Sequence, residues 1–512
     1  MLAAPPRPSE RVALASLVAV AGGSAAIYAA LTVSMSLDEF FPGPGVTLDF
    51  QFMLGDDWVA NTWRLYGSFV ALFALWGVAL WLASGLAVSR WSVAVVALGG
   101  VAMAAALVPM YPPFAVDFFH YLGEGRLLWV EGENPMVRGP GEFFPIGMSY
   151  GDEAAAYGPF WYWTLAPPVL LGGDDFPRSL LILKAWMAGW VALSALFGAL
   201  ISRRLGEHAG ASGGRELPVA VAIAWNPYVL WRVAGNGHND IAMMAFALLA
   251  IWFALSGYWR WVPAALAASI LIKYVSLLLV PVFAVALLRR PREERRALLP
   301  ELAIGSGVAL VLTAAAFAPM WEGLSVFDQV RAQSDRIITS FPELVSMTLD
   351  GPFDVSLERA DEIGLRVGLG LFVVVAGLLL WRQRVGNEAL IATCVLVLLA
   401  YGLLGIGWFR PWYFLWVIPL AALLPGRWWL ALTVVSSVAG LAPDVLEKYA
   451  VFVQALRPLT EVHSALPAIL AQFLPPAIVW LAALAATRSS SFGAAQLAAS
   501  TNDASRPARS AS

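Results

Sequence analysis

The chain has 512 residues, of which 60% are hydrophobic and only 13% are charged. Soluble domains have about 45–50% apolar and about 25% charged residues, so this composition excludes an ordinary soluble protein. The net charge of −3 and the lack of a basic arm argue against nucleic acid as a partner.

Cysteine and histidine usage argues against the common metal sites. The one cysteine, Cys394, stands within an apolar run, so neither an intrachain disulfide nor a cysteine-based metal site can form. The histidines His120, His208, His238 and His463 form no pair at the helical spacing of metal ligands. We therefore expect no metal and no other cofactor.

The first element carries Arg7 and Arg11 and then continues as an apolar stretch to Met35. Small residues at 22–26 leave a cleaved signal peptide open as an alternative. The stretch is nevertheless longer than the apolar core of a typical signal peptide. We expect an uncleaved first membrane helix.

Further apolar runs of about twenty residues match the hydrocarbon thickness of a bilayer. They predict an all-α, polytopic membrane protein with about twelve full spans. In chain order the expected spans are roughly 12–36, 65–86, 91–110, 179–202, 217–234, 239–257, 302–319, 364–381, 389–406, 412–425, 428–442 and 464–486.

Charge sign between these runs predicts the topology, because cytoplasmic connections of membrane proteins are rich in Lys and Arg. The basic connections, expected inside, lie at 7–11, 90, 203–204, 289–296, 382–384, 427 and 488. The acidic connections, expected outside, lie at 38–57, 117–175 and 328–361.

Two apolar pieces do not fit this alternation as single crossings. They are 158–172, interrupted by Pro167 and Pro168, and 261–288, with Lys273 near its middle. Both are expected to be re-entrant or broken helix pairs. Irregular backbone at membrane depth is tolerated only beside protein or a water-filled cavity, so both pieces predict a cavity.

The predicted organisation is one membrane-embedded domain over 1–486, with outer loops at 37–64, 111–178, 320–363 and 443–463. The Ser-, Ala- and Arg-rich residues 487–512 are expected to form a disordered cytoplasmic tail. No internal repeat is visible in the sequence, which disfavours the repeat-built transporter folds.

Asp117 opens a predicted amphipathic helix just beyond the third span. Asp117, Tyr121 and Glu124 share one helical face at i, i+4 and i+7 spacing. This pattern sets a carboxylate at the membrane surface, where it could act as a base. The alternative is that Asp117 only caps the helix, a role that aspartate performs well.

Polar residues also interrupt the middle of the chain. Tyr157 begins a Tyr-Gly-Pro turn, and Asn226 and Pro227 interrupt a membrane helix. The run 235–240, Gly-Asn-Gly-His-Asn-Asp, then connects to the next span at the outer boundary. It is either part of a site or an ordinary loop with a helix cap at its end.

Two cations stand in apolar surroundings. Lys273 lies within an apolar stretch, where a charge costs about 2.5–3.5 kcal/mol on insertion scales, so it is a functional candidate. Arg410 lies in the aromatic sequence Gly-Trp-Phe-Arg-Pro-Trp-Tyr at 407–413. The alternatives are a lysine that snorkels from a short helix end and an arginine in an interfacial aromatic belt.

The order of these features resembles the membrane-embedded GT-C glycosyltransferases, most closely the bacterial polyprenol-phosphate-mannose-dependent mannosyltransferases that elongate lipomannan. The resemblance covers about 110–415. It is carried by the segment from Asp117 through Arg126 and Asn134, by 225–227 with 237–240, by Lys273 with Pro281, and by 411–413. The sequence departs from the family's usual Asn-Pro-Tyr at 134–136, which is Asn-Pro-Met here.

The resemblance implies an inverting transfer of a hexose, mannose in most of the family, from a polyprenyl-phosphate sugar to a glycan or glycolipid hydroxyl. It implies a multi-pass protein of the plasma membrane with its site on the extracytoplasmic face. The expected general base is Asp117. The expected donor-phosphate residues are Lys273, Arg410, Arg126 and His238, and the expected substrate-binding residues are Tyr121, Asn134, Tyr157, Asn239, Asp240, Trp412 and Tyr413.

Two alternatives remain open from the residues alone. A transporter or lipid flippase would also use broken helices and embedded charges, but it would centre them at the bilayer midplane. A lipid-linked glycan ligase or polymerase would use other sequence segments.

Overall fold

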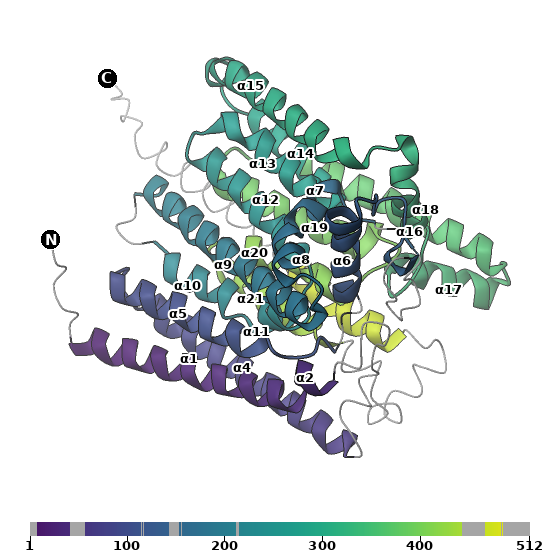
Figure 1. Cartoon of the computed structure of the whole chain (residues 1–512). Coiled ribbons are helices and arrows are strands. Elements are labelled where there is room, and N and C mark those ends of the chain that lie inside the picture. The colour runs from purple at the N-terminus through teal and green to yellow at the C-terminus, as the bar shows by residue number, and fades with distance from the viewer. Residues whose placement is uncertain are drawn as a thin grey trace, which may run out of the picture.

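The computed structural model describes residues 8–40, 57–113, 115, 117–142, 153–154, 156–210, 214–442, 466–482 and 484. Over this part of the chain all regular elements are helices, and β-pairing is limited to two isolated bridges (Figure 1). The all-α prediction is therefore confirmed. The expected outer loop 443–463 and the expected tail 487–512 lie outside the described residues.

In chain order, the α-helices are α1 (Pro8–Ser34), α2 (Leu37–Phe40), α4 (Trp58–Ser84), α5 (Arg90–Leu107), α6 (Asp117–Arg126), α7 (Pro159–Thr164), α8 (Ala166–Gly172), α9 (Phe176–His208), α10 (Glu216–Ala224), α11 (Pro227–Leu230), α12 (Asp240–Leu255), α13 (Val262–Ile270), α14 (Leu279–Leu288), α15 (Arg292–Phe317), α16 (Asp328–Ser334), α17 (Phe341–Phe353), α18 (Leu357–Arg382), α19 (Asn387–Ala400), α20 (Ile418–Ala421) and α21 (Arg427–Ala439). Short 3₁₀ or π segments are η1 (Leu127–Glu131), η2 (Pro140–Glu142), η3 (Trp231–Gly235), η4 (Trp259–Trp261), η5 (Tyr274–Leu278), η6 (Ala318–Met320), η7 (Gly323–Phe327), η8 (Tyr401–Gly405) and η9 (Pro411–Trp416).

Among the described residues, seven helices are long and apolar enough to cross a membrane, and a bent pair makes up to eight. The seven are Ser9–Ser34, Ala60–Ser84, Arg90–Leu107, Phe176–His208, Arg292–Met320, Leu357–Arg382 and Asn387–Gly405. The expected spans 239–257, 412–425, 428–442 and 464–486 coincide with shorter helical segments. The total of twelve crossings therefore stays a prediction.

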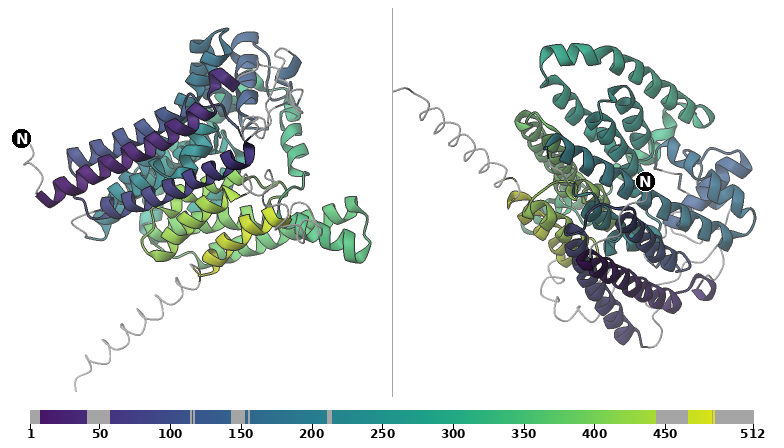
Figure 2. Two further views of the ribbon diagram at one scale, coloured as in Figure 1. Left: turned by 90° about the horizontal axis from the view of Figure 1, so that it is seen from below. Right: turned by 90° about the vertical axis from the view of Figure 1, so that its left-hand side faces the viewer.

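The helices pack as one bundle with distinct edges. Helices α1, α4 and α5 lie side by side at one edge, α9, α10 and α12 pack together in the interior, and α15 lies at the opposite edge (Figures 1 and 2). Near the other end of the chain, α17 packs along α18, and this pair projects from the body of the bundle (Figure 2). The burial pattern agrees, because α12 is buried along most of its length whereas α15 is largely exposed.

Local sequence explains the bend in the middle of the bundle. The Asn226 side chain accepts hydrogen bonds from the backbone N–H groups of Tyr228 and Val229, so it ends α10 and caps α11. Pro227 occupies the first position of α11, where a missing N–H costs nothing. The pair Glu216–Ala224 and Pro227–Gly235 bends by 43° as a result.

The segment expected to be a second broken pair is interrupted at Lys273. Helix α13 ends at Ile270, Lys273 is extended with φ −148°, and η5 and α14 follow. The Arg290 guanidinium lies 4.8 Å from the Trp259 ring centroid, so the beginning and the end of the segment lie on the same side of the bundle. The chain therefore turns back, and Lys273 is at the tip of the turn.

The segment expected to be the first broken pair meets this tip. Helices α7 and α8 are separated at Leu165, where the helix direction changes before two prolines. The N–H groups of Gly158 and Phe160 donate to the carbonyls of Ile272 and Leu271, at 3.1 and 2.9 Å. Backbone groups that each broken segment leaves free thus satisfy one another, as membrane-depth backbone requires.

Candidate active site

Helix α6 holds Asp117 against the loop that follows the bent span. The backbone at Gly237 has φ +75°, and a Cβ there would lie 2.0 Å from the Phe118 ring, so only glycine fits. This close approach of the Gly237 loop fixes the position of α6. The Asp117 side chain is partly buried and forms no ion pair with a described residue.

Tyr157 reaches the same place from the start of α7. Its hydroxyl lies 3.0 Å from that of Tyr121, and the two rings pack edge to face. A Cβ at Gly158 would lie 2.2 Å from the Leu271 carbonyl oxygen, so this glycine allows α7 to dock on the tip beside Lys273. The Tyr-Gly-Pro turn therefore has a structural reason beyond chain reversal.

Lys273 forms a buried ion pair and does not snorkel. Its Nζ lies 2.7 Å from Asp240 Oδ1, and its side chain is 14% exposed. The rings of Tyr413, Tyr157 and Trp416 lie 4.8–5.8 Å from Nζ, within cation–π range. Because Asp240 neutralises the lysine, the pair carries no net charge at the tip.

Arg410 has a different environment. Its guanidinium lies 4.5 Å from the Trp408 ring and 5.5 Å from the Trp412 ring, but no described carboxylate forms an ion pair with it. Backbone hydrogen bonds of Ile338 with Gly407 and Phe409, at 3.0 and 3.1 Å, tie this loop to the connection after α16. Arg410 is therefore a well-held cation without a counterion.

These elements enclose a pocket of about 70 Å³. Seven residues proposed from the sequence line it: Asp117, Tyr121, Tyr157, Lys273, Arg410, Trp412 and Tyr413. The remaining lining residues are His120, Glu124, Glu153, Ala154, Ala156, Gln333, Arg336 and Trp408, which sequence reasoning did not single out as site residues. Among these additional lining residues, Glu124 could have been found from the sequence, because it shares a helical face with Asp117.

The other expected residues lie beside or behind the pocket. The buried His238 ring stacks on Trp412 with centroids 4.0 Å apart, and Asp240, behind the pocket, pairs with Lys273 and accepts a hydrogen bond from the Trp416 indole. Asn239 is fully buried and is not in the pocket wall.

Arg126 and Asn134 are used elsewhere in the fold. Arg126 donates to Gly173 O at 2.7 Å and pairs with Asp174 at 3.2 Å, away from the pocket. The Asn134 amide donates to Met320 O at 2.7 Å, which fastens the outer loop to the end of α15. The structure does not bring either side chain to the pocket lining.

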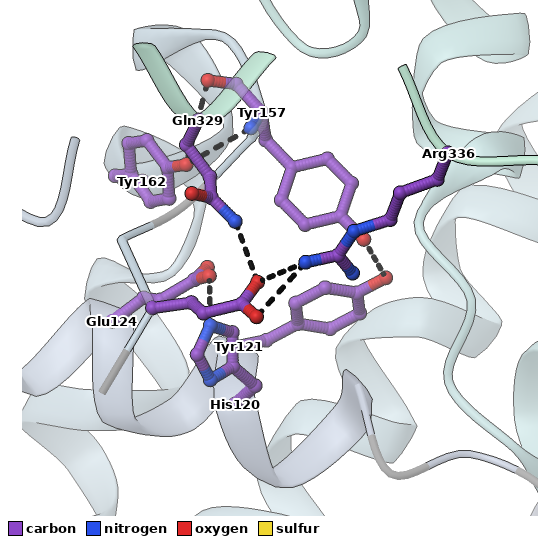
Figure 3. A network of polar contacts seen from close by, with 8 residues as sticks. His120, Tyr121, Glu124, Tyr157, Tyr162, Gln329 and Arg336 are labelled. Atoms are coloured by element: carbon purple, nitrogen blue, oxygen red, sulfur yellow. Dashed lines mark hydrogen bonds and ion pairs between the residues drawn. The ribbon is translucent and has the colours of Figure 1, made fainter. Parts of the chain in front are cut away.

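Polar side chains from three segments form a network at the pocket (Figure 3). The Arg336 Nη2 atom lies 2.9 Å from each oxygen of Glu153, and Gln329 donates to Glu153 Oε2 at 2.6 Å. Glu153 is thus fully engaged. In the same network, His120 Nε2 lies 3.1 Å from Glu124 Oε1.

Burial dominates the electrostatics of the α6 side chains. It raises the pKa of Asp117; Arg410 and Lys273 oppose this rise, whereas the Asp240 carboxylate adds to it. Burial and then the Asp117 charge raise the pKa of Glu124 well above its usual range. Burial lowers the pKa of His120 to about 4, so this imidazole is neutral at neutral pH.

A larger cavity, of about 600 Å³, lies at the other end of α18 and α19. Its lining is mainly aliphatic, with Arg382, Arg384 and Glu388 as its charged residues. Asp117, the candidate base, does not line it. The smaller pocket is therefore the candidate active site despite its size.

A family model described as the N-terminal domain of alpha-(1->6)-mannopyranosyltransferases matches residues 14–289, more than half of the chain. The chain belongs to this family. A search of curated proteins found no match. Membership identifies a membrane mannosyltransferase and favours transfer chemistry over the transporter alternative. The match includes Asp117, Tyr157, Asp240 and Lys273, whereas Arg410 lies beyond it.

Proposed function

We propose that this mannosyltransferase moves mannose from a polyprenyl-phosphate donor to a hydroxyl of a glycan or glycolipid, with inversion at the transferred carbon. The observation that carries the proposal is one pocket that contains a carboxylate, Asp117, and a cation, Arg410, neither of which forms an ion pair with a described residue. A displacement of phosphate by a hydroxyl needs these two groups: one takes a proton and the other receives negative charge.

In the proposed step the acceptor oxygen forms a bond to the anomeric carbon of mannose while the bond from that carbon to the phosphate oxygen breaks. The acceptor proton goes to Asp117, and the bonding electrons leave with the polyprenyl phosphate. One displacement inverts the anomeric configuration. A raised pKa makes ionised Asp117 a stronger base than an ordinary aspartate, which suits the removal of an alcohol proton.

Charge balance supports a donor with a single phosphate. The Lys273 charge is already offset by Asp240, and Arg336 is already offset by Glu153, so Arg410 is the cation left for the ligand among the described lining residues. A nucleotide diphosphate would bring more negative charge than one arginine offsets. The described residues also contain no cluster of three or more metal-binding side chains.

The supporting residues have indirect roles in this proposal. Asp240 holds Lys273, whose ammonium lines the pocket with Arg410 and, with three N–H donors, can also donate a hydrogen bond to the phosphate. Tyr121, Tyr157, Trp412 and Tyr413 form the cleft wall, and His238 supports Trp412 by stacking. Asn239 shapes the donor side from behind the wall.

Charge distribution supports a site on the extracytoplasmic face of the plasma membrane. The basic run 289–296 is joined to the end of α18 through hydrogen bonds from Arg289 to carbonyls at 380 and 381. The tip with Lys273 lies at the other end of α13 and α14. Since basic connections face the cytoplasm, the pocket faces outward.

The test is transfer by the purified protein in detergent. Polyprenyl-phosphate mannose carrying a radiolabel is incubated with a mannoside acceptor, with GDP-mannose as the rival donor and EDTA in parallel samples. We expect product from the lipid donor only, unchanged by EDTA, with the opposite anomeric configuration to the donor by NMR. Transfer from GDP-mannose that EDTA abolishes would reject the proposed donor.

A further inference from the structure

Glu124 is a carboxyl in the pocket wall that has no role in the proposed reaction. It is fully buried, and neither of its oxygens accepts a hydrogen bond from a described residue. His120 Nε2 lies near Oε1 at 3.1 Å, whereas Oε2 has no partner (Figure 3). An unpartnered buried polar group costs roughly 1–3 kcal/mol, so a carboxyl retained in this state points to a ligand.

Geometry relates Glu124 to the proposed base. Both residues are on α6, seven positions apart, so they lie on the same face and about 10 Å apart along the helix axis. Both line the same pocket, with His120 and Tyr121 between them. A hydroxyl at each carboxyl, held at about 2.7 Å, leaves a gap that one sugar ring can bridge.

The chemistry of the Glu124 surroundings favours a hydroxyl over a cation. Burial and then the Asp117 charge raise its pKa well above the usual range, which favours the protonated carboxyl, a group that both donates and accepts. Hydroxyls of a sugar do the same. The unpartnered indole N–H of Trp408, also in the pocket wall, provides a second hydrogen-bond donor for such a ligand.

Glu153 does not compete for this role, although it is a second new carboxylate in the pocket. Both of its oxygens are taken by Arg336 and Gln329. The pocket has the room of about two water molecules, so binding of a sugar ring requires that side chains around it move. The pair Glu153–Arg336, about one-third exposed, lies on its more open side.

We propose that Glu124 binds the acceptor: its carboxyl forms hydrogen bonds with ring hydroxyls of a terminal hexopyranose whose attacked hydroxyl lies at Asp117. This acceptor subsite rests on the proposed function, since it takes Asp117 as the base. The family's 1→6 linkage suits the arrangement, because the 2- and 3-hydroxyls of a hexopyranose lie on the side of the ring away from the exocyclic 6-hydroxyl.

The experiment combines variants of Glu124 with altered acceptors. Methyl α-mannopyranoside and its 2-, 3- and 4-deoxy analogues are used with wild type, Glu124→Leu, Glu124→Gln and the exposed control Glu207→Gln. We expect Glu124→Leu to raise the acceptor KM by roughly 10- to 100-fold, the range of a hydrogen bond to a polar carboxyl, with the donor KM unchanged. Glu124→Gln, which keeps a donor and an acceptor, should recover most of the loss.

The deoxy analogues identify the hydroxyl. One of them should bind wild type as weakly as the parent mannoside binds Glu124→Leu, and the variant should not discriminate between the two sugars. A structural role predicts a lower melting temperature for Glu124→Leu; we expect little change, because the substitution loses the His120 contact but also removes a buried oxygen, Oε2, that has no described hydrogen-bond partner. Equal acceptor KM and equal deoxy profiles in wild type and Glu124→Leu would overturn the subsite.

Failure of the proposed function is a separate result. If wild type transfers nothing from polyprenyl-phosphate mannose, binding of methyl α-mannopyranoside is compared directly by ligand-observed NMR for wild type and Glu124→Leu. Weaker binding to the variant supports the subsite although the donor is wrong. Equal binding, or none to either protein, rejects it.

Discussion

Replacement of Asp117 by asparagine separates a catalytic base from a helix cap. The substitution keeps the size of the side chain and most of its hydrogen-bonding capacity but removes the basic oxygen. We expect kcat to fall by about 10²–10⁴, the usual contribution of a general base, which corresponds to about 3–5 kcal/mol of activation free energy. The acceptor and donor KM values should change little, because no described ion pair is lost.

The same substitution should lower activity but should not lower the thermal stability of the protein. Burial raises the folded-state pKa of Asp117, so its favourable contribution to stability is complete below the unfolded pKa of about 3.9 and is lost as pH rises through the folded value. At pH 7 the ionised carboxylate therefore opposes folding. Asp117→Asn should melt at the same temperature as wild type or slightly higher, measured by thermal unfolding in detergent.

The pH–rate profile tests the same residue in the wild-type protein. Because the base must be ionised, kcat/KM should fall on the acid side with an apparent pKa above the ordinary aspartate value. Asp117→Asn should lose that limb, whereas the exposed control Asp328→Asn should keep it. Near-normal turnover by Asp117→Asn, at full protein stability, would show that Asp117 is a helix cap and that the assigned base is wrong.

Three further predictions follow from the same pocket and from the topology. Lys273→Ala leaves the Asp240 carboxylate buried and unpaired, so the protein should lose about 3–5 kcal/mol of stability. The double variant with Asp240→Ala should regain part of this stability but no activity. Equal melting temperatures for the single and double variants would contradict the pairing. Arg410→Gln should raise the donor KM by roughly 10- to 100-fold and leave the acceptor KM unchanged, measured in steady-state assays with each substrate varied; a change in the acceptor KM alone would reverse the assignment. In a cysteine-free background, an impermeant thiol reagent should label Asp335→Cys but not Glu293→Cys in intact cells, and the reverse pattern would invert the topology.

Much of the fold could be predicted from the sequence because membrane insertion is decided locally. A helix in lipid must satisfy its own backbone and present apolar side chains, so hydropathy alone located α1, α4, α5, α9, α15 and α18. Charge alternation predicted that 261–288 does not cross as a single helix, and the structure has a break at Lys273. Helices shorter than a full span, such as α12 and α20, have a weaker hydropathy signal.

The candidate site was only partly predictable, because its members meet through packing. Lys273 and Arg410 were visible in the sequence as charges in apolar or aromatic runs, and Asp117 as the first residue of an amphipathic helix just beyond a span. Nothing local indicated that Glu153 and Arg336, which are 183 residues apart, would form an ion pair in the pocket wall.

The sequence by itself showed that this protein belongs in a membrane and which connections between apolar runs are basic or acidic. It also singled out the charged residues within apolar runs as functional candidates. Tertiary structure decided which of those charges neutralise one another. It paired Lys273 with Asp240 and Arg126 with Asp174, and among the described residues it gave Arg410 no ion-pair partner. The physical reason is that hydropathy depends on a residue and its neighbours in the chain, whereas an ion pair depends on two side chains within about 4 Å, a distance that only the packing of α6, α7, α12 and the Lys273 tip brings about.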